Sequence, residues 1–130
     1  RFACQSVDIS ISDIESTIIV MSDDIHIELV VVTMTFDANQ RQADNAELLA
    51  ILSKYIVLTR MADGCRNVDL CSSITTSGRH LVIQKWDSDE MQRQHFDSPL
   101  MVEMATSCSG ILASAPEIDM WEGTSAHDLR

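Results

Sequence analysis

Two segments of this chain are apolar at both alternating positions, and this pattern strongly restricts how the chain can fold. Residues 25–36 read IHIELVVVTMTF, and residues 80–86 read HLVIQKW. Successive side chains of a strand point to opposite faces of the sheet. A strand that is apolar at both parities is therefore covered on both faces. A sheet built from these two strands needs apolar cover on each of its sides.

A helix is predicted within residues 36–60, where apolar residues recur three or four positions apart. The stripe consists of Leu48, Leu49, Leu52, Tyr55 and Ile56. Asp44, followed three residues later by Glu47, has the form of a capping box, although Asp37 is an alternative cap for an earlier start. Gly64 is expected to supply the left-handed residue that ends the helix.

The rest of the chain indicates two more strands and two more helical stretches. Residues 66–74 alternate as a half-exposed strand, and they form a predicted hairpin with residues 80–86. A helix is expected over 87–96, with Asp and Ser as possible caps, and a new one begins at Ser98-Pro99. In this second helix the apolar positions recur every four residues. Residues 115–123 predict a final short strand.

The resulting order β-α-β-β-α-β is that of the split βαβ plan, so the expected class is α+β, ferredoxin-like. Such a protomer has an antiparallel sheet with both helices on one face. The uncovered apolar face then predicts a homodimer in which sheet packs on sheet. We expect an N-terminal extension over 1–24, the folded domain over 25–122, and a polar C-terminal tail over 123–130.

Charge and cysteine content narrow the classes of partner. Nine Lys and Arg face 20 Asp and Glu, a formal net charge of −11 in 130 residues. Nucleic acid and anionic membrane surfaces both require basic patches, so neither is expected as a partner. The cysteines at positions 4, 65, 71 and 108 form no CxxC pair and no zinc-finger spacing. We interpret them as reduced thiols, as in a cytoplasmic protein.

Three segments resemble the antibiotic biosynthesis monooxygenase (ABM) family in their order and spacing. They are TRMADGCRNVDL, QKWDSDEMQRQHFDSP and APEIDMW, and the resemblance covers residues 25–122. It implies a dimeric α/β barrel made of two ferredoxin-like protomers. Members of this family include cofactor-free monooxygenases that act on phenolic or quinol-like substrates, haem-degrading enzymes and isomerases of small phosphorylated metabolites.

The haem-degrading branch of the family fits this sequence poorly. Trp86 matches the catalytic tryptophan of that branch. However, the position of its iron-ligating histidine falls at or next to Ala105, and the first strand lacks the asparagine that the branch uses. Without an axial ligand there is no reason to expect haem. We therefore expect no cofactor and no metal, and a small apolar or aromatic substrate.

Trp86 and His95 are the candidate catalytic residues. Trp86 can wall an apolar cavity and offer its indole N–H as a donor, or it can simply close the core. His95 has the pKa range to accept a phenolic proton, and the resemblance supports a histidine in this helix; the alternative is an exposed imidazole on a polar helix. A cavity lined by both residues would support oxidation of a quinol-like substrate by O2.

Four further residues are candidates for substrate binding: Met91, Phe96, His80 and Arg60. Met and Phe near helices more often belong to the core, and His80 at a strand start is more often solvated. Arg60 could bind an anionic oxygen, or its positive charge could interact favourably with the helix dipole at the C-terminal end of the helix. Two other functions stay open, a non-catalytic dimer that binds a small ligand or a partner and a small-molecule isomerase on the same fold.

Overall fold

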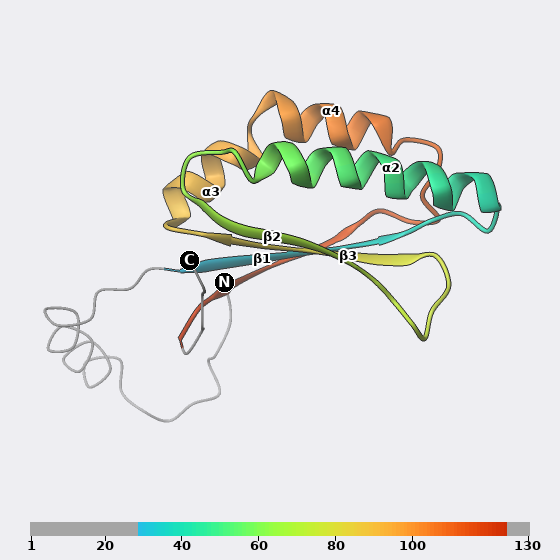
Figure 1. Cartoon of the computed structure of the whole chain (residues 1–130), viewed down its shortest axis with the longest axis horizontal. Helices are drawn as coiled ribbons and strands as arrows, with labels where there is room; N and C mark the ends of the chain where they lie inside the picture. Colours follow the sequence, from blue (N-terminus) through green and yellow to red (C-terminus); the bar gives the residue numbers. More distant parts are fainter. Residues whose placement is uncertain (1–28, 125–130) are drawn as a thin grey trace, which may run out of the picture.

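The structure is a computed structural model that describes residues 29–124 (Figure 1). The predicted N-terminal extension and most of the C-terminal tail lie outside the described residues. The elements are β1 (Val30–Asp37), α2 (Gln42–Thr59), β2 (Cys65–Ser72), β3 (Arg79–Trp86), α3 (Asp89–Phe96), α4 (Pro99–Ser107) and β4 (Glu117–Glu122). No helix in this part of the chain is long and apolar enough to cross a membrane.

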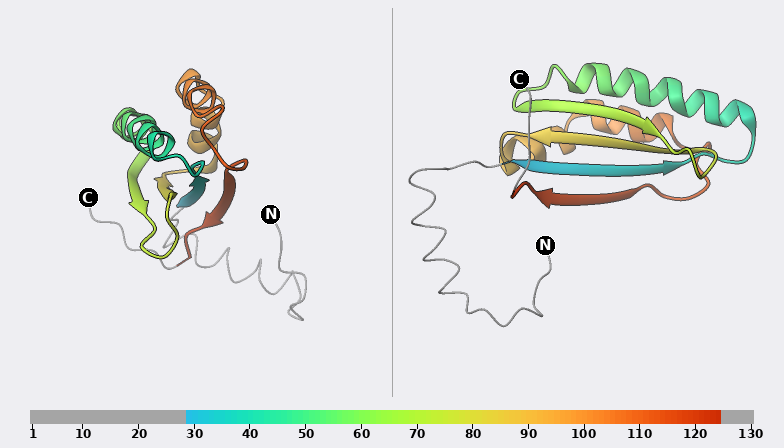
Figure 2. Two further views of the ribbon diagram at one scale, coloured as in Figure 1. Left: turned by 90° about the vertical axis from the view of Figure 1, so that its right-hand side faces the viewer. Right: turned by 60° about the horizontal axis from the view of Figure 1, so that its bottom comes forward.

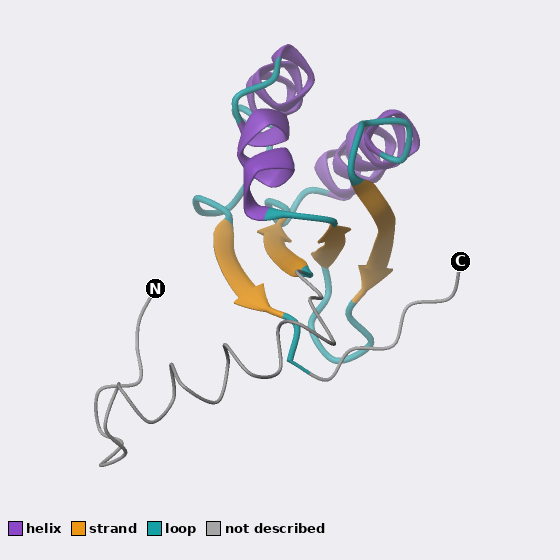
Figure 3. Ribbon diagram, turned by 90° about the vertical axis from the view of Figure 1, so that its left-hand side faces the viewer, coloured by secondary structure: helices purple, strands orange, loops and turns teal. Residues whose placement is uncertain are grey.

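The four strands form one antiparallel sheet in the order β2-β3-β1-β4, seen side by side in the right-hand view of Figure 2. All three helices lie on one face of this sheet (Figure 3). This arrangement is the ferredoxin-like α+β fold, and it confirms the fold class that the strand and helix patterns predicted. The hairpin between β2 and β3 is confirmed as well.

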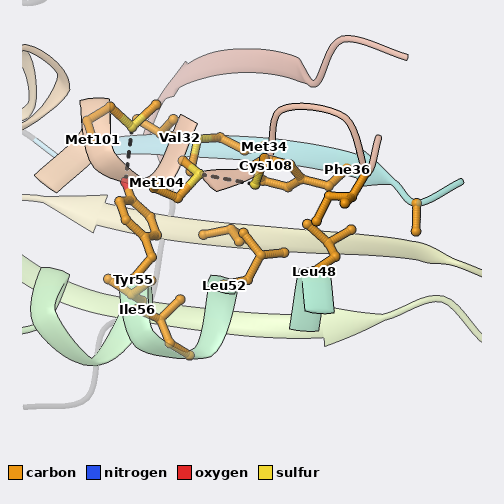
Figure 4. Close-up of a cluster of buried hydrophobic side chains, with 14 of the residues drawn as sticks. Val32, Met34, Phe36, Leu48, Leu52, Tyr55, Ile56, Met101, Met104 and Cys108 are labelled. Atoms are coloured by element: carbon orange, nitrogen blue, oxygen red, sulfur yellow. Dashed lines mark hydrogen bonds between the residues drawn. The ribbon is translucent and has the colours of Figure 1, made fainter. Parts of the chain in front are cut away.

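The core lies between the helices and the even-numbered side chains of β1 and β3. Met34 is opposite Val82 in the register of these strands, and both side chains are almost completely buried. Figure 4 shows how the apolar side chains of α2 and α4 meet the sheet. The main members of this cluster are Val32, Met34, Phe36, Leu48, Leu52, Tyr55, Val68, Val82, Trp86, Met104 and Cys108.

Within the described residues no helix covers the opposite face of the sheet (Figure 2), and the two central strands present Val31, Thr33, Thr35, Leu81 and Ile83 there. Val31, Leu81 and Ile83 on this face are half-buried. Trp121 of β4 is 57% exposed, and its indole N–H donates to Thr33 Oγ1 at 3.2 Å. The prediction of apolar residues on both faces is therefore confirmed for β3, whereas β1 has only Val31 on its helix-free face, followed by Thr33 and Thr35.

The start of α2 differs from the expected capping box. The N-cap is Arg41, which makes no side-chain capping hydrogen bond, and Asp44 is the third helical residue. The Asp44 side chain is buried and accepts a hydrogen bond from Arg41 Nε at 2.8 Å. The predicted capping box was wrong because the helix begins before Asp44. Asp44 therefore lies within the first turn, where its side chain bonds to that of Arg41 instead of capping the backbone.

Gly64 has the expected left-handed conformation but a different position. The helix ends at Thr59, and its C-cap Arg60 is right-handed. Gly64, with φ of +81°, lies in the turn that leads into β2. The placement of Gly64 at the helix end was therefore wrong, although its need for positive φ is confirmed.

Substitution of Gly64 tests how closely this turn approaches α3. A Cβ atom at Gly64 would lie 2.6 Å from both Cβ and Cγ of Met91. Gly110 also has positive φ, +88°, but nothing lies within 4 Å of its Cβ position. We expect Gly110→Ala to lower the free energy of unfolding by only about 1–2 kcal/mol, the cost of placing an alanine in the left-handed conformation. Gly64→Ala should lose a further ~1–3 kcal/mol in urea unfolding because of overpacking. Equal losses would contradict the close approach.

The two short helices each begin at a serine, which was predicted for α4 and was one of the two possible caps for α3. Ser88 Oγ accepts a hydrogen bond from the backbone N–H of Met91 at 3.2 Å, and Ser98 Oγ accepts one from Met101 at 3.3 Å. Pro99 occupies the first turn of α4, where its missing N–H costs nothing. These caps fix where α3 and α4 begin, and thereby where His95 and Met101 lie.

Candidate functional site

A chain of buried hydrogen bonds connects three elements at one end of the sheet. Trp86 Nε1 donates to Gln84 Oε1 at 2.9 Å, and Gln84 Nε2 donates to the Tyr55 oxygen at 2.7 Å. The same oxygen lies 2.6 Å from His95 Nε2. Tyr55 comes from α2, Gln84 and Trp86 come from β3, and His95 comes from α3. We call these four residues the polar network.

The imidazole of His95 packs between two aromatic rings. Its centroid lies 4.8 Å from that of Trp86, with 33° between the ring planes, and 5.5 Å from that of Tyr55. Trp86 is fully buried and His95 is 6% exposed. The structure thus brings together the two residues that the sequence singled out, inside the core.

Burial keeps both titratable members of the network neutral. It raises the pKa of Tyr55 to about 12, against the opposing effect of the hydrogen bond from Gln84. Burial also lowers the pKa of His95 below its ordinary value. At neutral pH the phenol therefore keeps its proton, and the 2.6 Å contact suits donation from the Tyr55 O–H to a neutral His95 Nε2. His95 then carries its own proton on Nδ1.

The Thr59 hydroxyl, one turn after Tyr55 in α2, interacts with the Tyr55 hydroxyl and opposes the rise of the Tyr55 pKa. Gln92 Oε1, one turn before His95 in α3, is buried and makes no hydrogen bond within the described part of the chain. Burying such an atom without a partner costs about 1–3 kcal/mol. A water molecule or a polar group of a ligand would remove this cost.

A pocket of about 500 Å³ lies beside the network, between α4 and the edge of the sheet formed by β1 and β4. It is partly open to solvent and its walls are largely apolar. The side chains of α4 and the two strands supply most of the lining: Met34, Phe36, Met101, Met104, Ala105, Cys108, Leu112 and Ile118. Met101 joins the pocket to the network, because its sulfur lies 3.5 Å from the Tyr55 oxygen (Figure 4).

The pocket is not the one that the sequence predicted. Neither Trp86 nor His95 is among its lining residues. The indole N–H, expected as a donor to substrate, is bonded to Gln84 instead. The alternative of an exposed His95 is also wrong, because this residue lies with Gln92 on the buried side of α3 and faces Trp86.

Three of the candidates for substrate binding lie away from the pocket. Met91 is half-buried against the turn at Gly64, and Phe96 is 37% exposed on the outside of α3. Arg60 uses Nε and Nη2 to donate to the backbone oxygen of Val68, at 3.1 and 2.9 Å. Arg60 therefore ties the end of α2 to β2.

His80 is buried, so the expectation of a solvated side chain was wrong. It has the same strand parity as Val82 and therefore faces the helices. Its Nδ1 lies 2.8 Å from Ser72 Oγ and its Nε2 lies 2.7 Å from Asn45 Oδ1. His80 stands at the opposite end of β3 from Trp86, and the structure does not bring it into the polar network.

Sequence reasoning missed Tyr55, Gln84 and Met101. Tyr55 was counted only as part of the apolar stripe of α2. A signal was present for Gln84, since it occupies the buried parity of β3 between Val82 and Trp86. A polar residue at a buried strand position needs a hydrogen-bond partner, and this requirement pointed to a tyrosine or histidine across the core.

Acidification should destabilise the protein because of His95 and His80. Burial lowers the pKa of both imidazoles, although Asp37 opposes the shift at His80. The unfolded chain therefore binds more protons than the folded one between these lowered values and about 6.5. Stability is fully present above that pH and decreases as the pH falls below it. Urea unfolding at pH 7.5 and 5.5 checks this, and a stability that rises on acidification would contradict it.

Fold and site together define a ferredoxin-like α+β protein with an apolar pocket next to a buried tyrosine–histidine pair. The chain belongs to the antibiotic biosynthesis monooxygenase family, whose sequence profile matches residues 29–106. No curated protein matches the chain. Among residues 29–124, no three His, Cys, Asp or Glu side chains gather as they would around a metal ion.

Solved structures with the same fold come from several bacteria. Rv0793 of Mycobacterium tuberculosis is 24% identical, with a TM-score of 0.66 over 78% of this chain and 97% of its own. SnoaB of Streptomyces nogalater, a cofactor-independent oxygenase, is 13% identical, with a TM-score of 0.65 over 75% and 95%. NE2512 of Nitrosomonas europaea, of unknown function, is 14% identical, with a TM-score of 0.70 over 82% and 99%.

Proposed function

We propose that this protein is a cofactor-independent monooxygenase that oxidises a small aromatic or quinol-like substrate with O2. The observation that carries the proposal is the contact of Met101 with both an apolar pocket and the buried Tyr55–His95 pair. Membership of the family and the likeness to SnoaB support the reaction class. A flat, largely apolar substrate suits the lining of the pocket.

In this proposal the network removes a proton from the substrate. Methionine is flexible, so the side chain of Met101 can turn aside and let a substrate hydroxyl reach the Tyr55 oxygen. The substrate proton passes to Tyr55 as the tyrosine proton passes to His95 Nε2. The electron-rich anion then reduces O2, and one oxygen atom enters the substrate while the other leaves as water. Gln92 Oε1 is available to a polar group or a water.

We further propose a homodimer that forms through the helix-free face of the sheet. Leu81 and Ile83 lie at the centre of this face, and Val31 lies nearer its end, opposite the exposed ring of Trp121. A second copy would cover these side chains by isologous packing of sheet on sheet. Sedimentation of the wild type and of a Val31→Glu variant tests the dimer, since a buried, unpaired carboxylate should dissociate it.

Oxygen consumption tests the proposed activity directly. The purified protein is incubated with a panel of quinols and anthrone-like phenols while an electrode follows O2. We expect uptake above autoxidation in buffer, with a product whose mass is higher by one oxygen atom for each substrate hydrogen pair lost. Uptake equal to autoxidation for the whole panel would contradict the proposal.

A non-catalytic ligand-binding protein is the second candidate, and one observation favours it. Every polar contact of Trp86 and Gln84 is made within the network, and the pocket itself is lined mainly by apolar groups. Such a pocket can hold a ligand without acting on it. Thermal stabilisation by a ligand without O2 uptake would favour this function, whereas turnover without oxygen would favour an isomerase.

A further inference from the structure

The wall of the pocket formed by α4 is unusually rich in sulfur. Met101, Met104 and Cys108 lie three and four residues apart, and all three line the pocket together with Met34 from β1. Cys108 Sγ lies 3.9 Å from Met104 Sδ, and Figure 4 shows this contact as a dashed line. Four sulfur-containing side chains thus line one pocket, although the sulfur of Met101 is directed to the Tyr55 oxygen.

The spacing of the two closest sulfurs matches metal ligation. Two sulfurs bonded to one ion at about 2.3 Å, in a trigonal arrangement, lie about 4.0 Å apart. Cys108 and Met104 therefore need almost no movement to share an ion. Thiolate and thioether ligands are soft and disfavour Mg(II) and Ca(II). A thiolate also binds Zn(II), but a site with one thiolate and thioethers as its other ligands favours Cu(I). Sites of this kind contain few or no carboxylates and histidines, and the pocket has neither in its lining.

We propose that the pocket binds one Cu(I) ion through Cys108 Sγ, Met104 Sδ and the thioether of Met34. Binding replaces the thiol proton, so that one proton is released and an S–Cu bond forms for each ion bound. The thiolate neutralises the cation, which allows the ion to enter an apolar site. The net charge of −11 on the chain further favours approach of a cation. This inference does not depend on the proposed oxygenase activity.

The ordinary alternative is that these residues only pack. Buried methionines fill gaps in many cores, and a buried thiol behaves as a small apolar group. Burial raises the pKa of the Cys108 thiol, which disfavours a free thiolate. A metal ion overcomes this cost by bonding to the sulfur directly. In a titration with metal ions, the pocket residues should therefore respond if they bind an ion and stay unchanged if they only pack.

Silver(I) and copper(I) titrations of the whole chain decide between them. The protein is labelled at the methionine methyl carbons for NMR. Ag(I), a redox-inert substitute for Cu(I), should shift the NMR signals of Met104 and Met34 at one equivalent. The signal of Met61, which is 77% exposed, should not move. Signals are assigned with Met→Leu variants, which nearly conserve side-chain volume and so keep the fold. If neither pocket methionine responds, the proposal is wrong.

A second experiment measures the affinity for Cu(I) under anaerobic conditions, by competition with a Cu(I)-selective chelator. Met104→Leu and Cys108→Ser should each weaken Cu(I) binding by about tenfold or more, a loss of ~1.4 kcal/mol. Met61→Leu and Cys71→Ser are matched controls, because both residues are exposed and lie outside the pocket. Loss of binding in Cys71→Ser together with full binding in Cys108→Ser would place the ion at a surface thiol and overturn the proposal.

Discussion

A His95→Gln variant should lose about 10²- to 10⁴-fold of any substrate-dependent O2 uptake, the usual contribution of a general acid–base group. Glutamine can still accept a hydrogen bond from the Tyr55 phenol, so the contact that places Tyr55 is kept. It cannot take up the proton that the reaction releases. The initial rate of O2 consumption at saturating substrate measures the effect.

The matched control for this variant is His80→Gln. His80 is also a buried histidine with two hydrogen bonds, but it lies at the other end of β3. We expect His80→Gln to keep the wild-type turnover number once the folded fraction is taken into account. A similar loss in both variants would indicate damage to the fold, and it would remove His95 from the proposed relay.

Substitution of Trp86 by alanine should lower the free energy of unfolding by about 3–5 kcal/mol, near the upper end for a core position. The side chain is fully buried, and its ring packs on the imidazole of His95 with centroids 4.8 Å apart. Its removal leaves a cavity beside the network and deprives Gln84 Oε1 of its donor. Chemical denaturation followed by circular dichroism measures the loss.

Trp86→Phe separates packing from hydrogen bonding at this position. Phenylalanine keeps most of the ring area and removes the N–H, so about 1–3 kcal/mol should be lost through the unpaired Gln84 oxygen. Trp121→Phe is the control, with both variants made in the Val31→Glu background that keeps the proposed dimer apart, and it should cost much less because the Trp121 ring is 57% exposed in the single chain. Equal losses for Trp86→Phe and Trp121→Phe would show that the network adds nothing to stability.

Much of the fold followed from local pattern, whereas the site depended on contacts between distant segments. The strand parities of β1 and β3 predicted a sheet covered on both faces, and the serines at positions 88 and 98 predicted where two helices begin. The burial of His80 was missed because one polar residue at a strand end carries no sign of its face. Parity places His80 with Val82 and Trp86, but both parities of β3 are apolar, so the side that the helices cover becomes visible only when the sheet is assembled.

The dependence on contacts between distant segments also explains which residues of the site were predicted and which were missed. Trp86 and His95 were found together because a short turn and a short helix link them. Tyr55 lies 40 residues from His95 in the chain, and only the packing of α2 against the sheet brings its oxygen to the imidazole. The apolar stripe of α2 predicted that Tyr55 is buried, but a stripe does not specify the partner of its hydroxyl.

The separate serine caps of α3 and α4 give each helix its own start. The two helices are nevertheless coupled, because the Ser98 N–H donates to the backbone oxygen of His95 at 2.9 Å and the Met101 sulfur contacts the Tyr55 oxygen. A substitution at Met101 therefore reaches the imidazole through Tyr55, whereas Ala105 lies on the exposed side of α4 in the same wall. During evolution, ligand preference can thereby change at the outer part of the wall while the inner relay is retained.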